Sequence, residues 1–344
     1  MRAFNAFVAG VAGATLIVIV FAGLASSSRG DEAVASSVRF TASGDISSSK
    51  GAAATLNQVA GIEPDLHLSL GDLSYGQAGA EQAWCDFVTS RVGAAFPFEL
   101  VSGNHEDNGQ NGNVNDFAAC LPNQLPGLIG TYGRQYYVDV PQVNPLVRFI
   151  MISPALTYPD GVWSYAAGSP RYRWTADAID DARSDGVPWV VVGMHKPCLS
   201  VGQYECDDGA GLMNLLVDKR VDLVLSGHEH LYARSKQLAL NASCTKIVPA
   251  KYSAGCVTEG GNALVHGGGT VFATVGTGGT PLRNVFRADP ESPYFAAYSG
   301  LNLDPSFGNL SVSVTPGSLT AQFLPATGSF TDDFTIAAGG PPEN

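Results

Sequence analysis

The sequence predicts a layered α/β domain, in which helices pack against β-sheets. Two patterns predict it: short apolar runs stop abruptly at a glycine, as buried strands do, and helix-like segments lie between several of these runs. The chain of 344 residues also has 40 glycines and 20 prolines, which indicates many turns between short elements. A hydrophobic content of 45% with 15% charged residues excludes a disordered chain and leaves material for one large domain or two modest ones.

Each of the first predicted strands runs directly into a polar motif. The strands and their motifs are residues 38–43 with Gly44-Asp45, 66–70 with Gly71-Asp72, 96–102 with Gly103-Asn104-His105, 189–194 with His195, and 221–226 with Gly227-His228. In layered α/β sheets the loops after the carboxyl ends of the strands converge, and ligands bind there. We therefore expect these polar side chains to lie in one site.

Helices and further strands complete the expected layers. The best helix candidates are residues 49–62, 80–92, 175–184 and 210–219, and residues 136–153 resemble further strands. After Gly268, the runs 270–275, 310–314, 319–323 and 334–336 alternate with Gly/Pro turns, and we expect them to complete a second sheet of the same domain. Residues 106–115 do not match a calcium-binding loop and are expected to form a flexible loop beside the site.

The N-terminal residues 1–35 have the features of an export segment. Arg2 gives a basic start, residues 6–25 are apolar without a charge, and residues 26–31 are polar. Small residues at 23–25 and again at 33–35 offer cleavage sites. The apolar run is also just long enough to span a bilayer. The segment is therefore a cleaved signal peptide, which we favour, or a membrane anchor, and we expect a secreted, cell-surface or periplasmic protein.

The cysteines agree with export. Six cysteines, an even number, suggest three disulfides in an oxidising compartment. Closeness in the sequence favours the pairs Cys198–Cys206 and Cys244–Cys256, which leaves Cys85–Cys120 among the many pairings that six cysteines allow. The chain has no Cys-x-x-Cys pair, which argues against a structural zinc site.

The acidic composition narrows the classes of ligand. The formal net charge is −12, the isoelectric point is about 4.8, and no cluster of Lys and Arg stands out. Binding of nucleic acid through a basic face is therefore not expected. The same charge would repel a phosphate ester, so a site for one must carry local positive charge, which a metal centre supplies. The composition leaves the oligomeric state open.

Histidines gather at the ends of the predicted strands. The four that do so are His105, His195, His228 and His230. His67 and His266 lie elsewhere and are expected to be structural. A single histidine is most often structural, but four beside Asp45, Asp72 and Asn104 indicate a metal site. Oxygen and imidazole ligands without thiolates suit Fe, Mn or Zn.

Five motifs in order resemble those of the calcineurin-like metallophosphoesterases. They are Gly44-Asp45, Gly71-Asp72-Leu73-Ser74-Tyr75, Gly103-Asn104-His105-Glu106, Val192-Gly193-Met194-His195 and Gly227-His228-Glu229-His230. The Gly-Asp-x-x-Tyr form resembles the purple acid phosphatase branch in particular. A single motif of this kind is weak evidence for the family, whereas five motifs in the same order are strong evidence. The resemblance implies a catalytic domain at residues 38–338 with a four-layer αββα fold, a two-sheet β-sandwich flanked by helices.

The resemblance also implies seven ligands for two metal ions. They are Asp45, Tyr75 and His230 for the first ion, Asn104, His195 and His228 for the second, and Asp72 as a bridge between both. A phenolate ligand favours Fe(III), and a neutral amide with two imidazoles favours a divalent Fe, Zn or Mn. Two carboxylates, one phenolate and one hydroxide would leave the centre with about one positive charge, which suits a phosphate anion.

The reaction implied by the resemblance is hydrolysis of a phosphate ester. A metal-bound hydroxide would attack phosphorus in line and expel the alcohol. His105, which is not counted as a ligand, would contact the phosphate and protonate the leaving group. We expect an exported phosphomonoesterase with an acidic optimum. The alternatives are a phosphodiesterase acting on nucleotides or phospholipid head groups, and a non-catalytic surface binding module, against which the full ligand set argues.

Two positions depart from the purple acid phosphatase pattern. Ser47 stands where this branch usually has Gly and where other superfamily members have a metal-binding His, so Tyr75 must serve as the ligand. The extra histidine of plant-type relatives is missing from residues 200–213. Lys196 or Tyr204 is the expected substrate contact instead, although a solvated surface charge is an equal alternative for Lys196.

Overall fold

The computed structural model describes residue 10, residues 37–207 and residues 209–339. The export segment predicted at residues 1–35 lies, apart from residue 10, outside these described residues. Among the helices that the structure describes, none combines the length and the apolar character that a membrane span requires. The expected α/β fold is confirmed, since two large sheets lie between layers of helices.

Two large sheets contain most of the strands. Over the described residues, the first sheet has seven strands in the spatial order β14 (Ala263–Val265), β19 (Asp332–Ala337), β18 (Ser318–Thr327), β17 (Phe307–Thr315), β1 (Val38–Ser43), β2 (Leu66–Ser69) and β3 (Phe98–Leu100). Over the same residues, the second has eight in the order β16 (Phe295–Ser299), β11 (Tyr232–Ser235), β15 (Val271–Val275), β10 (Leu223–Ser226), β9 (Trp189–Gly193), β6 (Val147–Met151), β5 (Gln135–Val140) and β4 (Ile129–Thr131). Two short pairs are β7 (Leu156–Tyr158) with β8 (Gly161–Trp163) and β12 (Gln237–Leu238) with β13 (Val257–Glu259).

The main hydrophobic core lies between the two large sheets. Phe40 of β1 and Leu68 of β2 contribute to it from the first sheet, and Phe149 of β6 and Val191 of β9 from the second. The rings of Phe40 and Phe149 meet edge to face, with their centroids 4.9 Å apart. Removal of this apolar surface from water holds the sheets together.

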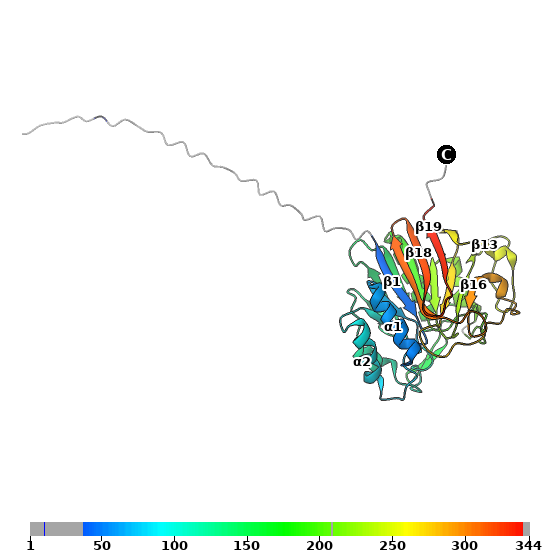
Figure 1. Ribbon diagram of the computed structural model, residues 1–344. Coiled ribbons are helices and arrows are strands. Elements are labelled where there is room, and N and C mark those ends of the chain that lie inside the picture. The colour runs from blue at the N-terminus through cyan, green and yellow to red at the C-terminus, as the bar shows by residue number, and fades with distance from the viewer. Residues whose placement is uncertain (1–9, 11–36, 208, 340–344) are drawn as a thin grey trace, which may run out of the picture. The chain divides into compact units, whose positions relative to one another are not determined.

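Helices cover the outer face of each sheet. Those that the structure describes are α1 (Lys50–Ile62), α2 (Glu81–Val92), α3 (Val114–Cys120), α4 (Pro170–Ser184) and α5 (Ala210–Asp218). Figure 1 shows α1 beside β1 and α2 beside α1, and the ring of Trp84 in α2 packs against Phe98 of β3 with a centroid distance of 6.4 Å. On the second sheet, Ile179 of α4 and Leu216 of α5 share a buried cluster with Val224 of β10. The layers therefore follow the αββα order that the sequence predicts.

The central strands of each sheet run parallel. β1, β2 and β3 share one direction, and so do β6, β9, β10 and β15. The N–H of Gly44, just after β1, donates to the carbonyl of Val275, at the end of β15, at 2.9 Å. This bond joins the carboxyl ends of strands from different sheets, so the polar motifs of both sheets meet at one place.

Three late strands join a different sheet from the one expected. The sequence predicts that the runs after Gly268 complete a second sheet, but β17, β18 and β19 belong to the first, where β17 pairs antiparallel with β1. Of the four predicted runs, β15 alone lies in the second sheet. The pairing of Val38 with Val314 depends on packing between distant segments, which local alternation of residues does not encode.

Two helices also differ from the prediction. α4 begins at Pro170 instead of at residue 175, because Ser169 caps it by accepting from the N–H of Tyr172 at 3.2 Å and proline fits the first turn. α3 was not predicted, since its seven residues are too few to show a helical period. Its first residues overlap the end of the predicted loop 106–115.

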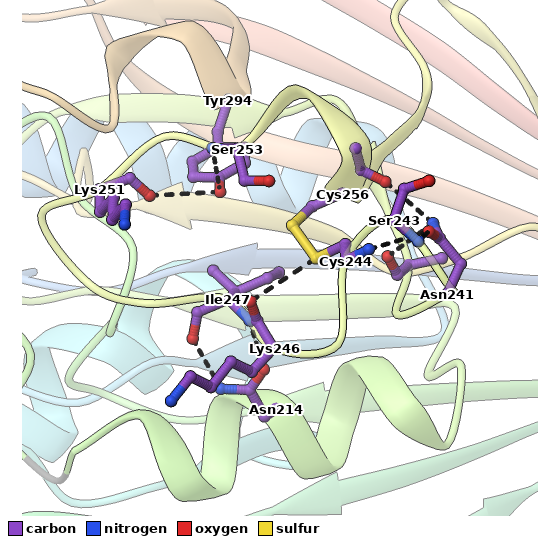
Figure 2. Close-up of a disulfide and its surroundings, with 12 residues drawn as sticks. Asn214, Asn241, Ser243, Cys244, Lys246, Ile247, Lys251, Ser253, Cys256 and Tyr294 are labelled. Carbon is purple, nitrogen blue, oxygen red and sulfur yellow. Dashed lines mark hydrogen bonds between the residues drawn. A yellow bond between two sulfur atoms is a disulfide. The ribbon is translucent and has the colours of Figure 1, made fainter.

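The six cysteines form the three predicted pairs, which are Cys85–Cys120, Cys198–Cys206 and Cys244–Cys256. Figure 2 shows the last of these, in a loop whose backbone is held by amide side chains. The Oδ1 of Asn214 accepts from the N–H of Ile247 at 2.7 Å, and the Oδ1 of Asn241 accepts from the N–H of Cys244 at 3.0 Å. The Cys198–Cys206 bond closes the loop that follows His195 and contains Tyr204.

Candidate dinuclear metal centre

The predicted ligands lie in loops that follow parallel strands of both sheets. Asp45 follows β1 and Asp72 follows β2, and the N–H of Asp45 donates to the carbonyl of Gly71 at 3.0 Å. His195 follows β9 of the second sheet, and its Nδ1 lies 2.8 Å from the carbonyl oxygen of Leu70. The contact between His195 and Leu70 connects the two sheets, so side chains from distant parts of the sequence share one site.

Several of these residues have left-handed backbone conformations. They are Asp45, Asp72, Tyr75 and His228, with φ angles of 58°, 50°, 52° and 69°. For a residue with a side chain, such a conformation costs about 1–3 kcal/mol. It persists where packing and hydrogen bonds hold the backbone in place, and such residues cluster at functional sites. The cluster supports a functional role for this end of the sheets.

Glycines in the motifs permit the close approach of the loops. Gly71 has a φ of 82°, and a Cβ at this position would lie 2.7 Å from Nδ1 of His195. A Cβ at Gly227 would lie 2.9 Å from Oδ2 of Asp45. Both distances are shorter than real Cβ contacts, so a larger residue at either position would displace a predicted ligand.

One group of donor atoms surrounds Asp45. Asp45, Asp72 and His230 each offer a ligand atom, and these atoms all lie within 4.8 Å of one another. Tyr75 completes the group. Its hydroxyl oxygen is 2.9 Å from Oδ1 of Asp45, 3.0 Å from Oδ2 of Asp72 and 3.1 Å from Nε2 of His230. The phenol therefore lies where a fourth ligand would be needed.

A second group of donor atoms contains Asp72 again. Asp72, His195 and His228 offer ligand atoms within 4.8 Å of one another. Nε2 of His195 is 3.1 Å from Oδ1 of Asp72 and 3.2 Å from Oδ1 of Asn104. The structure thus brings all seven predicted ligands together and places Asp72 in both groups, which is the position of a bridging carboxylate.

The hydrogen bonds behind the site fit the binding of metal ions. Nδ1 of His195 is bonded to the carbonyl of Leu70, and Nδ1 of His230 lies 3.0 Å from the carbonyl of Pro281. Because a carbonyl only accepts, each Nδ1 carries its hydrogen and each Nε2 presents a lone pair to the site. Carboxylate, phenol, amide and imidazole donors without a thiolate suit Fe, Mn and Zn.

The electrostatics of the bare site explain which protons a metal must displace. Burial lowers the pKa of His195, but the facing carboxylate of Asp72 outweighs it and raises the pKa to about 9. Burial and the charge of His195 lower the pKa of His228 to about 2, so this ring is a ready ligand. Burial and the carboxylates of Asp45 and Asp72 raise the pKa of Tyr75 far above its usual range. A cation is therefore required before Tyr75 can ionise.

His105 lies beside the donor groups without belonging to either. Its ring centroid is 4.3 Å from that of Tyr75, and its Nε2 is 3.6 Å from Oδ2 of Asp72. The side chain is 22% exposed, whereas that of His195 is fully buried. His105 is therefore the histidine of the site that a substrate can reach.

The two predicted substrate contacts border the site. Lys196 directly follows His195, and its Nζ is paired with Oδ2 of Asp207 at 2.7 Å. The ring of Tyr204 stacks on the ring of His228, with centroids 4.1 Å apart. Contact of either residue with a substrate stays a prediction.

Sequence reasoning missed Arg283. Its Nη1 donates to the carbonyl of His228 at 3.2 Å, and its guanidinium carbon lies 5.0 Å from the ring centroid of Tyr204. No sequence pattern indicated a role for Arg283, apart from its position after the glycine-rich turn at residues 276–279. Arg283 is thus a second positively charged side chain, besides Lys196, whose charge acts on His228.

The role of Glu106 was also missed, although the residue lies in a quoted motif. Its Oε1 accepts from the N–H of Leu73 at 2.7 Å, and its Oε2 accepts from the N–H of Gly103 at 3.0 Å. Burial and the charge of Asp72 raise the pKa of Glu106 to about 8. The carboxyl group joins the loops after β2 and β3 and so fixes two predicted ligands relative to each other.

The remaining histidines have structural surroundings. His67 is buried beside Thr41, whose Oγ1 is 2.9 Å from Nδ1, and burial lowers the pKa of its ring to about 3. The ring of His266 packs at a tilt against Trp189, with centroids 4.4 Å apart, and its Nε2 is 3.2 Å from Oδ1 of Asp222. Neither ring belongs to the donor groups found among the described residues.

A comparison with protein families agrees with this geometry. The family model described as calcineurin-like phosphoesterase matches residues 38–232, which is more than half of the chain. The chain therefore belongs to the calcineurin-like phosphoesterase family. Together with the two donor groups, this membership implies a dinuclear metal centre.

Known relatives confirm the resemblance to the purple acid phosphatase branch. An uncharacterized protein of Mycobacterium tuberculosis is 29% identical over 241 residues, which cover 64% of this chain and 43% of that protein. Purple acid phosphatase 22 of Arabidopsis thaliana is 26% identical over 214 residues, covering 59% of this chain and 46% of the relative. The matched region spans less than half the length of both relatives.

Solved structures show the same fold. The purple acid phosphatase PPD1 from yellow lupin (Lupinus luteus) seeds superposes with a TM-score of 0.64 at 16% sequence identity. The superposition covers 88% of this chain and 54% of the lupin chain. PhoD superposes with a TM-score of 0.54 at 13% identity, over 88% of this chain and 70% of that chain.

Proposed function

We propose that this chain is an exported phosphatase that hydrolyses phosphate monoesters at a dinuclear metal centre. The observation that carries the proposal is the position of Asp72 in both donor groups. An acidic optimum is proposed because several relatives are named purple acid phosphatases, and the preference for monoesters is proposed from the resemblance of the motifs. Export is supported by the complete pairing of the six cysteines.

The two halves of the donor set favour different metals. We assign a first ion to Asp45, Asp72, Tyr75 and His230, and a second to Asp72, Asn104, His195 and His228. The carboxylate and phenolate of the first set favour Fe(III), because they are hard anionic oxygen ligands. The amide and two imidazoles of the second set favour a divalent Fe, Zn or Mn.

The residues of the chain orient the substrate and move one proton. When bound, the two ions would polarise the phosphoryl group and lower the pKa of an attacking water. His105, at the accessible side of the site, gives a proton to the leaving oxygen. Tyr204 and Arg283 lie beside His228, and Lys196 directly follows His195. The positive charges of Lys196 and Arg283 would attract the anionic substrate.

An assay of purified protein tests the proposed function. The chain is loaded with Fe, Mn or Zn and assayed with p-nitrophenyl phosphate and bis(p-nitrophenyl) phosphate at acidic and neutral pH. We expect two metal ions per chain and faster turnover of the monoester at acidic pH. Faster turnover of the diester would favour a phosphodiesterase. Two bound ions with no turnover of either substrate would favour a binding module.

A further inference from the structure

Asn111 is attached to the site by all of its polar groups. It lies in the loop between Glu106 and α3. Its N–H donates to the carbonyl of His105 at 2.9 Å, and its own carbonyl accepts from Oγ of Ser74 at 3.2 Å. Its Nδ2 donates to the carbonyl of Gly76 at 2.6 Å, and its Oδ1 is hydrogen-bonded to Nδ1 of His105. The loop therefore presents one amide to the ring of His105.

These contacts fix which nitrogen of His105 carries a permanent hydrogen. The carbonyl of Gly76 can only accept, so the NH₂ group of Asn111 must face it. The amide oxygen of Asn111 then faces Nδ1 of His105, and because this oxygen also only accepts, Nδ1 must be the donor. The other nitrogen, Nε2, lies 3.6 Å from Oδ2 of Asp72 and faces the metal centre.

We propose that Asn111 is a positioning residue that holds His105 with its hydrogen on Nδ1 and its Nε2 directed at the leaving group. The proposal rests on the phosphatase function proposed above. It extends that function, because the sequence motifs quoted above end at Glu106 and assign no role to Asn111.

This geometry serves the transfer of one proton from His105 to the leaving group. The ester P–O bond breaks, its electron pair stays on the leaving oxygen, and that oxygen takes the proton from Nε2–H of His105. Water supplies the new P–O bond and gives one proton to the solvent. His105 ends as a neutral ring whose Nδ1–H is still hydrogen-bonded to the amide oxygen of Asn111. The amide therefore orients the ring without exchanging a proton.

A purely structural role for Asn111 is the alternative, since its bond to Gly76 also holds the loop in place. Two substitutions separate these roles. Asn111→Asp keeps an acceptor for Nδ1 but loses the donor to Gly76, whereas Asn111→Leu loses both. Asn113→Ala is the matched control, because Asn113 lies in the same loop and caps α3 by accepting from the N–H of Asn115 at 2.9 Å.

The first measurement compares kcat on two monoesters with leaving groups of different acidity. An alkyl phosphate such as glycerol phosphate needs a proton on its leaving oxygen, whereas p-nitrophenolate leaves without one. We expect Asn111→Leu to lower kcat about 30-fold on the alkyl ester and less than about threefold on the aryl ester, within the range of general acid catalysis. Asn111→Asp and Asn113→Ala should keep the wild-type ratio of the two rates. Equal losses on both esters in Asn111→Leu, or no loss, would overturn the proposal.

The second measurement does not depend on turnover. Long-range ¹H–¹⁵N NMR spectra of the zinc-loaded full chain report which ring nitrogen of each histidine carries hydrogen, and His105→Gln identifies the signal. We expect the neutral ring of His105 to carry its hydrogen on Nδ1 in the wild type, in Asn111→Asp and in Asn113→Ala, and on Nε2 in Asn111→Leu. An unchanged tautomer in Asn111→Leu would overturn the role of Asn111. Absence of all wild-type activity would count against the proposed function alone.

Discussion

The two halves of the metal centre share Asp72 but differ in their chemistry. On one side, the Tyr75 hydroxyl lies about equally far from Oδ1 of Asp45 and Nε2 of His230. On the other side, the neighbours of Asp72 are neutral or nitrogen donors, and the rings of His195 and His228 are 4.9 Å apart. Displacement of the Tyr75 proton therefore adds a negative charge to the first half. Displacement of a proton from His195 in the second half only makes that ring neutral. This difference would let one pocket select two unlike metal ions.

The largest effect is expected from the residue that the halves share. Asp72→Ala should remove both metal ions and lower kcat by at least about 10³-fold, because both donor groups lose a carboxylate. Metal content per chain and turnover of p-nitrophenyl phosphate check this. Asp160→Ala is the control, since that carboxylate is exposed and paired with Arg134. If Asp72→Ala still bound two metal ions, Asp72 would not be the ligand that both ions share.

Substitution within one half should separate the two ions. His228→Ala should lose the divalent ion and keep Fe(III), and His230→Ala should do the reverse, each with a loss of activity of about 100-fold or more. Metal analysis of both variants distinguishes the halves. Loss of both ions from both variants would mean that the ions bind only as a pair.

Tyr75→Phe tests the oxygen-rich half by its colour. A phenolate bound to Fe(III) gives a visible absorption band, so the wild type should be purple and the variant should lose the band, with a fall in activity of about tenfold. An absorption spectrum of iron-loaded protein is sufficient. A colourless wild type, or a band that survives the substitution, would exclude Tyr75 as the ligand.

The nitrogen-rich half should make the stability of the metal-free protein depend on pH. The pKa of His195 is raised to about 9 by Asp72, above its unfolded value of 6.5. The His195–Asp72 pair therefore stabilises the fold fully below about pH 6.5, and this contribution is lost as the pH rises toward 9. Thermal unfolding between pH 6 and 9 should show this fall, and His195→Gln should flatten it. A thermal stability that rises between pH 6 and 9 would exclude an ion pair between protonated His195 and Asp72.

The smallest effect concerns the border of the site. Lys196→Ala should raise KM for p-nitrophenyl phosphate by up to about fivefold, because its charge is already paired with Asp207. Lys219→Ala is the matched control, since Lys219 makes a similar ion pair with Asp180 on the helical side of the second sheet. An unchanged KM in Lys196→Ala would exclude contact with the substrate.

The sequence predicted those parts of the site that depend on local patterns. Apolar runs that stop at glycine place Asp45 and Asp72 at strand ends, and the apolar run 189–194 does the same for His195, without knowledge of the partner strands. Closeness in the sequence predicted the pairs Cys198–Cys206 and Cys244–Cys256, Cys85–Cys120 was the pair that remained, and the structure has the same three pairs. The four-layer fold followed from the motif resemblance and is confirmed.

Features that depend on packing between distant segments escaped prediction. β17 lies beside β1, although hundreds of residues separate them, and nothing in either run specifies that partner. Arg283 reaches the site through a turn after β15, where no residue pattern marks it. Asn111 reaches His105 through an irregular loop, whose fold depends on individual hydrogen bonds instead of a repeating period.

Anomalous diffraction from crystals of the metal-loaded protein tests the central claim most directly. Data collected at the absorption edges of iron and of the divalent metal locate each ion and identify it. We expect two peaks about 3.5–4 Å apart, with one carboxylate oxygen of Asp72 within bonding distance of both. A single peak, or two peaks of which only one contacts Asp72, would contradict the bridged dinuclear centre.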